Sequence, residues 1–304
     1  SATLIADMSA RGDWARVFAT VAFEHPIAAQ APCAVVAGVD VDQVTVAIRV
    51  QDKLDGAHRI IKPTDLATTT IVPEPLAHSL AGCPEIVVVA RPPLHARADL
   101  LPAALPWRFA GDVPGAVQQP GTPRAIEVVD ARPPDASLPR LSLAPSVTRF
   151  DETIRGLDAT PRRVLDALAG ATYAELHVHG IANAADGNAA YLALSPDRDG
   201  TYALRADAVR LTKFSRAPLI VLAACRGAAV APYLHQRWSL PDALLVAGAG
   251  AVVAIDVPIP DASARKIFDE LHRRVDAGEP VVKAVAAIRA SAPADAAWAK
   301  RLMV

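Results

Sequence analysis

A histidine and a cysteine occupy two positions of this sequence where paired chemistry can be built. His179-Gly180 and Cys225-Arg226-Gly227 each follow an apolar run that predicts a strand. A thiolate is a strong nucleophile, and a neighbouring imidazole can take the thiol proton and later protonate a leaving amine. We therefore predict that Cys225 is a nucleophile and that His179 is its general acid–base.

Small residues surround both candidates and would let a substrate carbonyl approach the sulfur. Gly180 suits this place because it has no side chain to obstruct the carbonyl. The backbone N–H groups of Gly180 and Cys225 are predicted to face the developing oxyanion. One such donor contributes roughly 3–4 kcal/mol in comparable sites.

Each candidate has a simpler explanation when taken alone. A cysteine after a buried strand is most often an inert small hydrophobic residue, and a lone strand histidine usually belongs to the core. The joint pattern favours catalysis, because both residues end predicted strands and both are followed closely by glycine.

His177 raises the alternative of a metal site, since a His-x-His pair can ligate zinc. No third ligand at suitable spacing is evident, and the loop after His179 offers only Asp186. We predict neither a metal nor another cofactor. Three cysteines do not indicate a disulfide framework. Cys33 and Cys83 have no partners at metal-ligand spacing and are expected to be structural.

The elements that must position the pair alternate between strands and helices from about residue 124. Such alternation predicts a mainly parallel sheet covered by helices, with sites beyond the carboxyl ends of its strands. Thr160-Pro161 predicts the start of a helix that ends at Gly170. The predicted strands are Ala125–Asp130, Tyr173–His179, Leu219–Ala223 and Ala251–Ile255, with a weaker candidate at Val147–Phe150.

Proline distinguishes the first part of the chain. Seventeen of the 26 prolines lie within the first 150 residues, and twelve fall between Pro84 and Pro145. Because proline blocks helix interiors, residues 1–122 are predicted to form a region of short strands and loops, and residues 123–304 the α/β domain. The strand candidates within residues 1–122 are Cys33–Val39, Val44–Val50 and Glu85–Ala90.

Composition excludes several classes of protein. Lys and Arg sum to 31 against 32 for Asp and Glu, and this net charge of −1 argues against a nucleic-acid coat or a polybasic membrane anchor. No apolar stretch approaches about 18 residues, and the first residues do not resemble a secretory signal. We expect a cytoplasmic protein with no direct nucleic-acid or membrane partner.

Several segments of the sequence resemble those of a known family. The segment from about Thr160 to Arg289 is similar to a CHAT domain, a bacterial peptidase domain related to caspases and separase. The sequence AACRG at residues 223–227 resembles the caspase nucleophile motif, and His179 lies 46 residues upstream of the cysteine. The segments ATPRRVLDALAGATYAELHVHG, SLPDALLVAGAGAVVAIDVP and LLPAALPWRF also resemble family elements.

The resemblance implies a caspase-like α/β fold. We expect the Pro-rich N-terminal region before it to form a pseudo-caspase subdomain or to dock a partner. It implies a cysteine endopeptidase with a His-Cys dyad, activated by a partner or signal in bacterial defence or cell death. Two alternatives remain: a catalytically silent interaction module, and a hydrolase or transferase for a non-peptide acyl substrate.

Substrate preference departs from the caspase pattern. Ala223 stands where caspases carry Gln, so an aspartate preference is not expected. Asp256 and Asp261 are candidates for a substrate pocket, although Asp261 also suits the N-cap of the next helix. The stretch 226–239 either gates the site or packs on the sheet edge.

Overall fold

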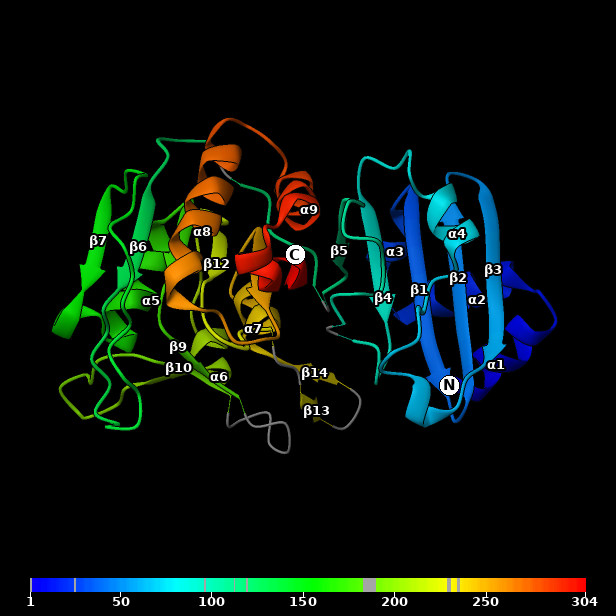
Figure 1. The fold of residues 1–304 in the computed structure, drawn as a ribbon, viewed down its shortest axis with the longest axis horizontal. Helices are drawn as coiled ribbons and strands as arrows, with labels where there is room; N and C mark the ends of the chain where they lie inside the picture. Colours follow the sequence, from blue (N-terminus) through cyan, green and yellow to red (C-terminus); the bar gives the residue numbers. More distant parts are fainter. Residues whose placement is uncertain are drawn as a thin grey trace. The chain divides into compact units, whose positions relative to one another are not determined.

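The computed structural model describes the chain except residues 1, 25, 96, 112, 119, 183–189, 229–230 and 234–235. The chain divides into two compact units, each with its own sheet (Figure 1). Unit 1 is Ser1–Asp112 with Pro280–Ala290, and unit 2 is Val113–Glu279 with Ser291–Val304. Asp186 and part of the predicted gate at 226–239 lie outside the described residues.

Unit 1 is built on a five-stranded sheet of order β3-β2-β1-β4-β5. Strands β1, β2 and β3 form an antiparallel meander, whereas β4 and β5 run parallel to β1. The three predicted strands form, and β3 and β5 are additional. Their bounds are β1 (Cys33–Asp40), β2 (Gln43–Val50), β3 (Lys53–Ile60), β4 (Ile86–Ala90) and β5 (Trp107–Phe109).

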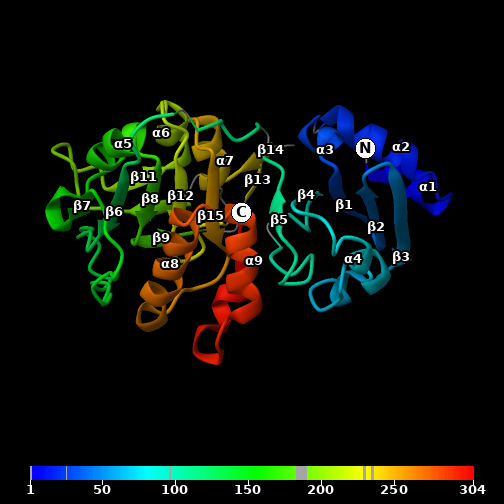
Figure 2. The ribbon, with the colours of Figure 1, turned by 90° about the horizontal axis from the view of Figure 1, so that it is seen from above.

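Helices also contribute to unit 1, so the prediction of only short strands and loops is wrong here. No proline precedes Pro26, and nothing in the first 24 residues prevents helix formation. Helices α1 (Ala2–Ala10), α2 (Trp14–Glu24) and α3 (Pro26–Gln30) cover one face of the sheet, and α4 (Glu74–Ser79) lies on the other (Figure 2). The short helix η1 (Pro63–Asp65) lies between β3 and α4.

Helix α9 (Val281–Ser291) joins unit 1 from the distant end of the chain. Its buried Arg289 donates to the carbonyl of Leu105 at 2.7 Å. The same guanidinium lies 4.6 Å from the ring centre of Trp107, a cation–π contact. These contacts explain why α9 groups with unit 1.

Cys33 and Cys83 form a disulfide, which corrects the expectation from the cysteine count. Cys33 begins β1, and Cys83 lies three residues before β4, the parallel neighbour of β1. This pairing of strands brings the two Cα atoms to 6.2 Å, a separation that a disulfide spans. Cys225 is the free cysteine.

Unit 2 contains the predicted mainly parallel sheet, of order β16-β15-β12-β8-β6-β7. Only β16 runs antiparallel to its neighbour in this sheet. The weak candidate at Val147–Phe150 is not a strand, and the edge strand begins at Glu152 instead. The bounds are β6 (Ala125–Val129), β7 (Glu152–Arg155), β8 (Tyr173–Leu176), β12 (Leu219–Leu222), β15 (Ala251–Ile255) and β16 (Leu302–Met303).

Helices cover both faces of this sheet. Helix α5 (Pro161–Gly170) begins as predicted, because the Thr160 side chain accepts a hydrogen bond from the Arg163 N–H. Helices α5, α6 (Ala206–Arg210) and α7 (Leu240–Val246) lie on one face, and α8 (Asp261–Asp276) lies on the other (Figure 2). The short helices are η2 (Gly156–Asp158) and η4 (Ala294–Arg301), and none of the described helices is long and apolar enough to cross a membrane.

The predicted strand Tyr173–His179 is two strands. Strand β8 ends at Leu176, and His179 begins β9 (His179–Ile181), which pairs antiparallel with β10 (Tyr191–Ala193). Strand β11 (Ala203–Arg205) completes this small sheet. A separate hairpin comprises β13 (Ala231–Tyr233) and β14 (Gln236–Trp238).

Candidate active site

The two candidate residues lie just beyond neighbouring parallel strands. Strands β8 and β12 are adjacent in the sheet, and their register pairs Leu176 with Leu222. His179 lies three residues beyond Leu176, and Cys225 lies three residues beyond Leu222. Both segments therefore leave the sheet at the same edge, and each candidate lies the same number of residues beyond a paired residue.

Gly180 provides direct evidence that the two segments meet. A Cβ atom built on Gly180 would lie 2.1 Å from the carbonyl oxygen of Cys225 and 3.3 Å from the Cβ of Ala224. Real Cβ atoms do not approach a backbone oxygen so closely, so only glycine fits without displacing the cysteine segment. The residue after the candidate base thus packs against the candidate nucleophile.

A backbone carbonyl orients His179. The Nε2 atom of His179 lies 2.6 Å from the carbonyl oxygen of Pro139. A carbonyl can only accept, so Nε2 carries the hydrogen in this contact. In the neutral ring Nδ1 then has the lone pair that can take a proton from a thiol. The sequence contains no signal for Pro139, which is 40 residues away along the chain.

The turn after Cys225 lies beside the segment that continues β15. The Cys225 Sγ accepts a hydrogen bond from the N–H of Ile259 at 3.3 Å and lies 3.9 Å from the Ile259 carbonyl oxygen. The N–H of Arg226 donates to the Val257 carbonyl at 3.2 Å. Cys225 is a free cysteine of intermediate burial.

The backbone N–H groups at this turn differ in whether they are already hydrogen-bonded. The N–H groups of Arg226 and Gly227 already bond to the carbonyls of Val257 and Ala224. Within the described part of the chain no hydrogen bond occupies the Cys225 N–H. Arg226 has a φ of +54°, a left-handed conformation that costs a non-glycine residue roughly 1–2 kcal/mol. Such strain is typical of turns at functional sites.

His177 belongs to the interior of the sheet. Its Nε2 lies 2.9 Å from Glu175 Oε2 and 3.3 Å from Arg265 Nη1, and His177 and Glu175 are at most 1% exposed. Tyr173 donates its hydroxyl to Glu175 at 2.5 Å. Burial, together with the charge of Glu175, raises the pKa of Tyr173 well above its ordinary value of 10.0. Among the described residues no three potential metal ligands cluster.

Comparison of the sequence with protein families identifies the family of the chain. The CHAT domain family matches residues 114–299, more than half of the chain. The chain belongs to the CHAT domain family. The match confirms the resemblance found in the sequence and places residues 114–299 within the caspase-like cysteine peptidase clan. No curated protein matches the chain.

The two acids predicted near the substrate pocket of this CHAT domain are both engaged. Asp256 pairs with Arg301, whose Nε donates to Oδ1 at 2.8 Å. Asp261 accepts a hydrogen bond from the N–H of Ser142 at 2.7 Å. Asp261 is the first residue of α8, and its N-cap is Pro260, so the N-cap interpretation is wrong.

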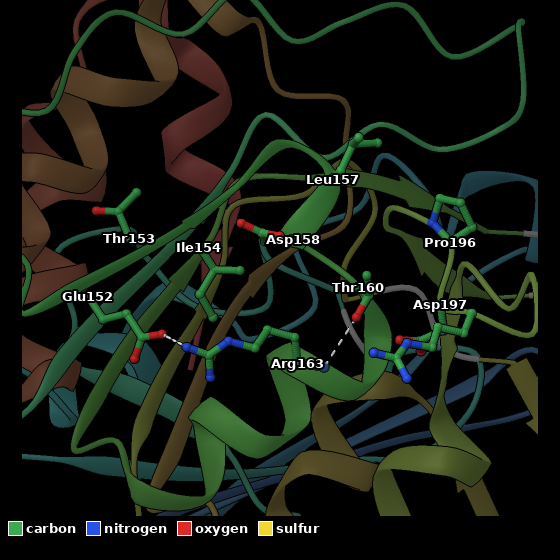
Figure 3. Close-up of a pocket in the computed structure, with 10 residues that line it drawn as sticks. Glu152, Thr153, Ile154, Leu157, Asp158, Thr160, Arg163, Pro196 and Asp197 are labelled. Atoms are coloured by element: carbon green, nitrogen blue, oxygen red, sulfur yellow. Dashed lines mark hydrogen bonds and ion pairs between the residues drawn. The ribbon is translucent and has the colours of Figure 1, made fainter.

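A surface pocket of about 430 Å³ lies beside the edge strand β7, and it contains neither His179 nor Cys225 (Figure 3). Glu152 from β7 and Arg163 from α5 point toward one another and form an ion pair across it. Asp197 also lines this pocket, and its carboxylate accepts from the Arg162 N–H at 3.1 Å. Glu152 and Arg163 pair with each other and a backbone N–H binds Asp197, so the pocket does not replace the His179–Cys225 site.

Proposed function

We propose that this CHAT protein is a cysteine endopeptidase that cleaves a protein substrate with Cys225 as nucleophile and His179 as general acid–base. The supporting observation is the contact between Gly180 and the Cys225 carbonyl, which places the two strand ends side by side. The Pro139 carbonyl adds support, since it holds the His179 ring with Nδ1 as the nitrogen that exchanges a proton.

The arrangement supports a two-step acyl transfer. His179 Nδ1 takes the proton of Cys225 Sγ, and the sulfur attacks the scissile carbonyl carbon. The oxyanion is held by the N–H groups of Cys225 and Gly180. His179 then returns the proton to the leaving amine as the C–N bond breaks. His179 then takes a proton from water, whose oxygen attacks the thioester carbonyl carbon. As the C–S bond breaks, the carboxylic acid is released and His179 returns the proton to the Cys225 sulfur.

A library of peptides with a fluorescent readout tests this proposal. Cys225→Ala should abolish turnover, and His179→Ala should slow it by at least about a hundredfold, the lower end of general acid–base contributions. The proposal fails if the Cys225→Ala protein retains full turnover. A library without aspartate at the cleaved position should be processed as well as one with it, because Ala223 offers no polar side chain to an acid.

Activation by a partner or signal is part of the proposal. The Sγ atom of Cys225 is bound to the backbone of Ile259 in this arrangement, which is the contact that a partner must release. The same contact favours the alternative of a catalytically silent caspase-fold module. Reaction of Cys225 with a peptide chloromethyl ketone separates the two, since a silent module should show no peptide-dependent labelling.

Unit 1 is proposed to serve as a pseudo-caspase or docking subdomain for the partner, and the family context suggests a cytoplasmic role in bacterial defence or cell death. The Cys33–Cys83 disulfide bears on the compartment, because disulfides are rare in reducing cytosol. Cysteine thiols can be alkylated in cell lysates before and after reduction and counted by mass spectrometry. The difference gives the oxidised fraction of the Cys33–Cys83 pair in the cell and so tests the cytoplasmic location. A fully oxidised pair in the cell would argue against it.

A further inference from the structure

The loop between β6 and β7 contains the carbonyl that orients His179. We name residues 139–148 of this loop the strap. Pro139, at one end of the strap, holds His179 Nε2 at 2.6 Å. Arg140, the next residue, pairs with Asp130, which directly follows β6, and the hydrogen bond from Arg140 lowers the pKa of Asp130. The first residue of the strap thus contacts the candidate base, and an ion pair holds the second residue in place.

Helix α8 binds the rest of the strap with three polar residues spaced four apart. Asp261, Arg265 and Asp269 therefore lie along one face of the helix. Asp261 accepts from the Ser142 N–H at 2.7 Å. One turn later, Arg265 Nε donates to the Ala144 carbonyl at 3.1 Å.

Asp269 holds the far end of the strap. Its carboxylate accepts from the Ser146 hydroxyl at 2.6 Å, the Val147 N–H at 3.2 Å and the Thr148 hydroxyl at 3.1 Å. Asp269 is 6% exposed, and the bonds that it makes to the strap are partly buried. A buried carboxylate with three donors fixes both the position and the direction of the chain it binds.

Arg265 links this face of α8 to the strand that leads to His179. Its Nη1 donates to Glu127 on β6 and lies 3.3 Å from the Nε2 of His177. His177 precedes His179 by two residues. One helix face therefore contacts both segments that flank the candidate base, the strap and the end of β8.

The strap could pack against α8 without these polar contacts. Burying charged groups is costly, and apolar packing of equal volume often stabilises a protein as much or more. Polar contacts instead fix direction, and a carbonyl must be aimed within a few tenths of an ångström to hold an imidazole. Asp261, Arg265 and Asp269, which we name the α8 ladder, are therefore suited to fixing the direction of the Pro139 carbonyl.

We propose that Asp261, Arg265 and Asp269 are positioning residues that hold the Pro139 carbonyl on His179 and thereby keep the proton on Nε2. This inference rests on the proposed function, because it concerns the same candidate base. Asp261 is the decisive member, since it holds Ser142, three residues from Pro139, and is only partly buried in the first turn of α8.

The test uses the rate at which iodoacetamide alkylates Cys225 in the full, unreduced chain, where Cys225 is the free cysteine. Asp261→Ala should slow alkylation at neutral pH about threefold to tenfold, the scale of one lost hydrogen bond. Asp261→Asn keeps the acceptor and should restore the parent rate. Asp276→Ala, at the exposed other end of α8, is the matched control and should change nothing.

A spectroscopic signature accompanies the rate. The imidazole nitrogen shifts of His179 should show a larger share of the Nδ1–H form in Asp261→Ala and the parent distribution in Asp261→Asn. Unfolding temperatures should stay close together, and Asp261→Ser provides a second variant if the alanine protein does not fold. A purely structural role for Asp261 would lower the unfolding temperature without moving the tautomer.

The outcomes separate this inference from the proposed function. If Asp261→Ala matches the parent, or if Asp261→Asn is as slow as Asp261→Ala, the positioning role is wrong, whereas the dyad stands as long as His179→Ala slows alkylation. If His179→Ala leaves the alkylation rate unchanged, the proposed function itself fails.

Discussion

The two units are each built on a sheet with apolar strands, but they differ in the polar side chains that they bury beside it. In unit 1 the buried polar residues among those described are Ser9, Thr45 and Arg289. In unit 2 the face of β6 and β8 beneath α8 buries a set of ionisable side chains, namely Glu127, Glu175, His177, Arg265, Asp269 and His272. Apolar strands are thus sufficient to form a sheet, and the ionisable interior is a separate feature of unit 2.

This difference indicates what unit 2 requires beyond stability. Buried ionisable groups usually reduce stability relative to apolar packing, and they concentrate at functional sites. Unit 1 instead combines apolar packing with the Cys33–Cys83 disulfide. The comparison predicts that polar substitutions in the two units will have very different effects.

The largest effect should come from Glu175, which serves both Tyr173 and His177 in the interior of unit 2. Glu175→Ala should lower the free energy of unfolding by about 3–5 kcal/mol, because it leaves buried partners unpaired. Glu85→Ala in unit 1 removes the half-exposed partner of Arg108 and should cost less than about 1 kcal/mol. Denaturant unfolding measures both, and equal losses would remove the distinction between the units.

The disulfide should matter next, and only for unit 1. Reduction of Cys33–Cys83 should lower the stability of unit 1 by about 2–4 kcal/mol, since it frees a long loop in the unfolded chain. Hydrogen exchange read by mass spectrometry should show faster exchange in β1 and β4 and unchanged exchange in β8 and β12. Faster exchange throughout both sheets would contradict an effect confined to unit 1.

A smaller effect is expected where the two strand ends meet. Gly180→Ala should cost about 1–3 kcal/mol, the usual cost of overpacking, because the new Cβ would displace the Cys225 carbonyl. Gly82→Ala in unit 1 meets no atom within 4 Å and is the matched control. Alkylation of Cys225 should change in the first variant alone. An unaltered Gly180→Ala protein would show that the segments do not touch.

The smallest effect concerns alkaline pH. The pKa of Tyr173 is raised in the folded chain, so the unfolded chain ionises first and stability is lost as pH rises above the ordinary value of 10.0. Tyr173→Phe cannot ionise there, although it is less stable at neutral pH without the bond to Glu175. The stability curves of parent and variant should therefore converge above pH 10.0, and parallel curves would contradict the buried-tyrosine account.

Several elements of unit 2 could be predicted from sequence because their signals are local. The helix start at Thr160-Pro161 and the strands β6, β12 and β15 follow from capping and continuous apolar runs. The CHAT resemblance likewise depends on short motifs and is confirmed by the family match. Helices α1 and α2 do not follow from the proline count, because the prolines of the first 150 residues all lie beyond these two helices.

The contacts that organise the site are long-range, and no local pattern specifies them. Pro139 reaches His179 from 40 residues away, and Cys33 reaches Cys83 from 50 residues away. The sequence does contain a weak signal for the α8 ladder, since Asp261, Arg265 and Asp269 recur every four residues on one face. That spacing is also typical of a solvated helix face, and only the fold shows that these residues bind the strap.

A crystal structure of the chain with a peptide chloromethyl ketone bound to Cys225 would test the central claim most directly. The account predicts a bond from the inhibitor to Cys225 Sγ, the inhibitor oxygen within hydrogen-bond distance of the Cys225 and Gly180 N–H groups, and His179 Nε2 still on the Pro139 carbonyl. An adduct whose oxygen points away from both N–H groups, with His179 turned out of reach of the sulfur, would contradict it.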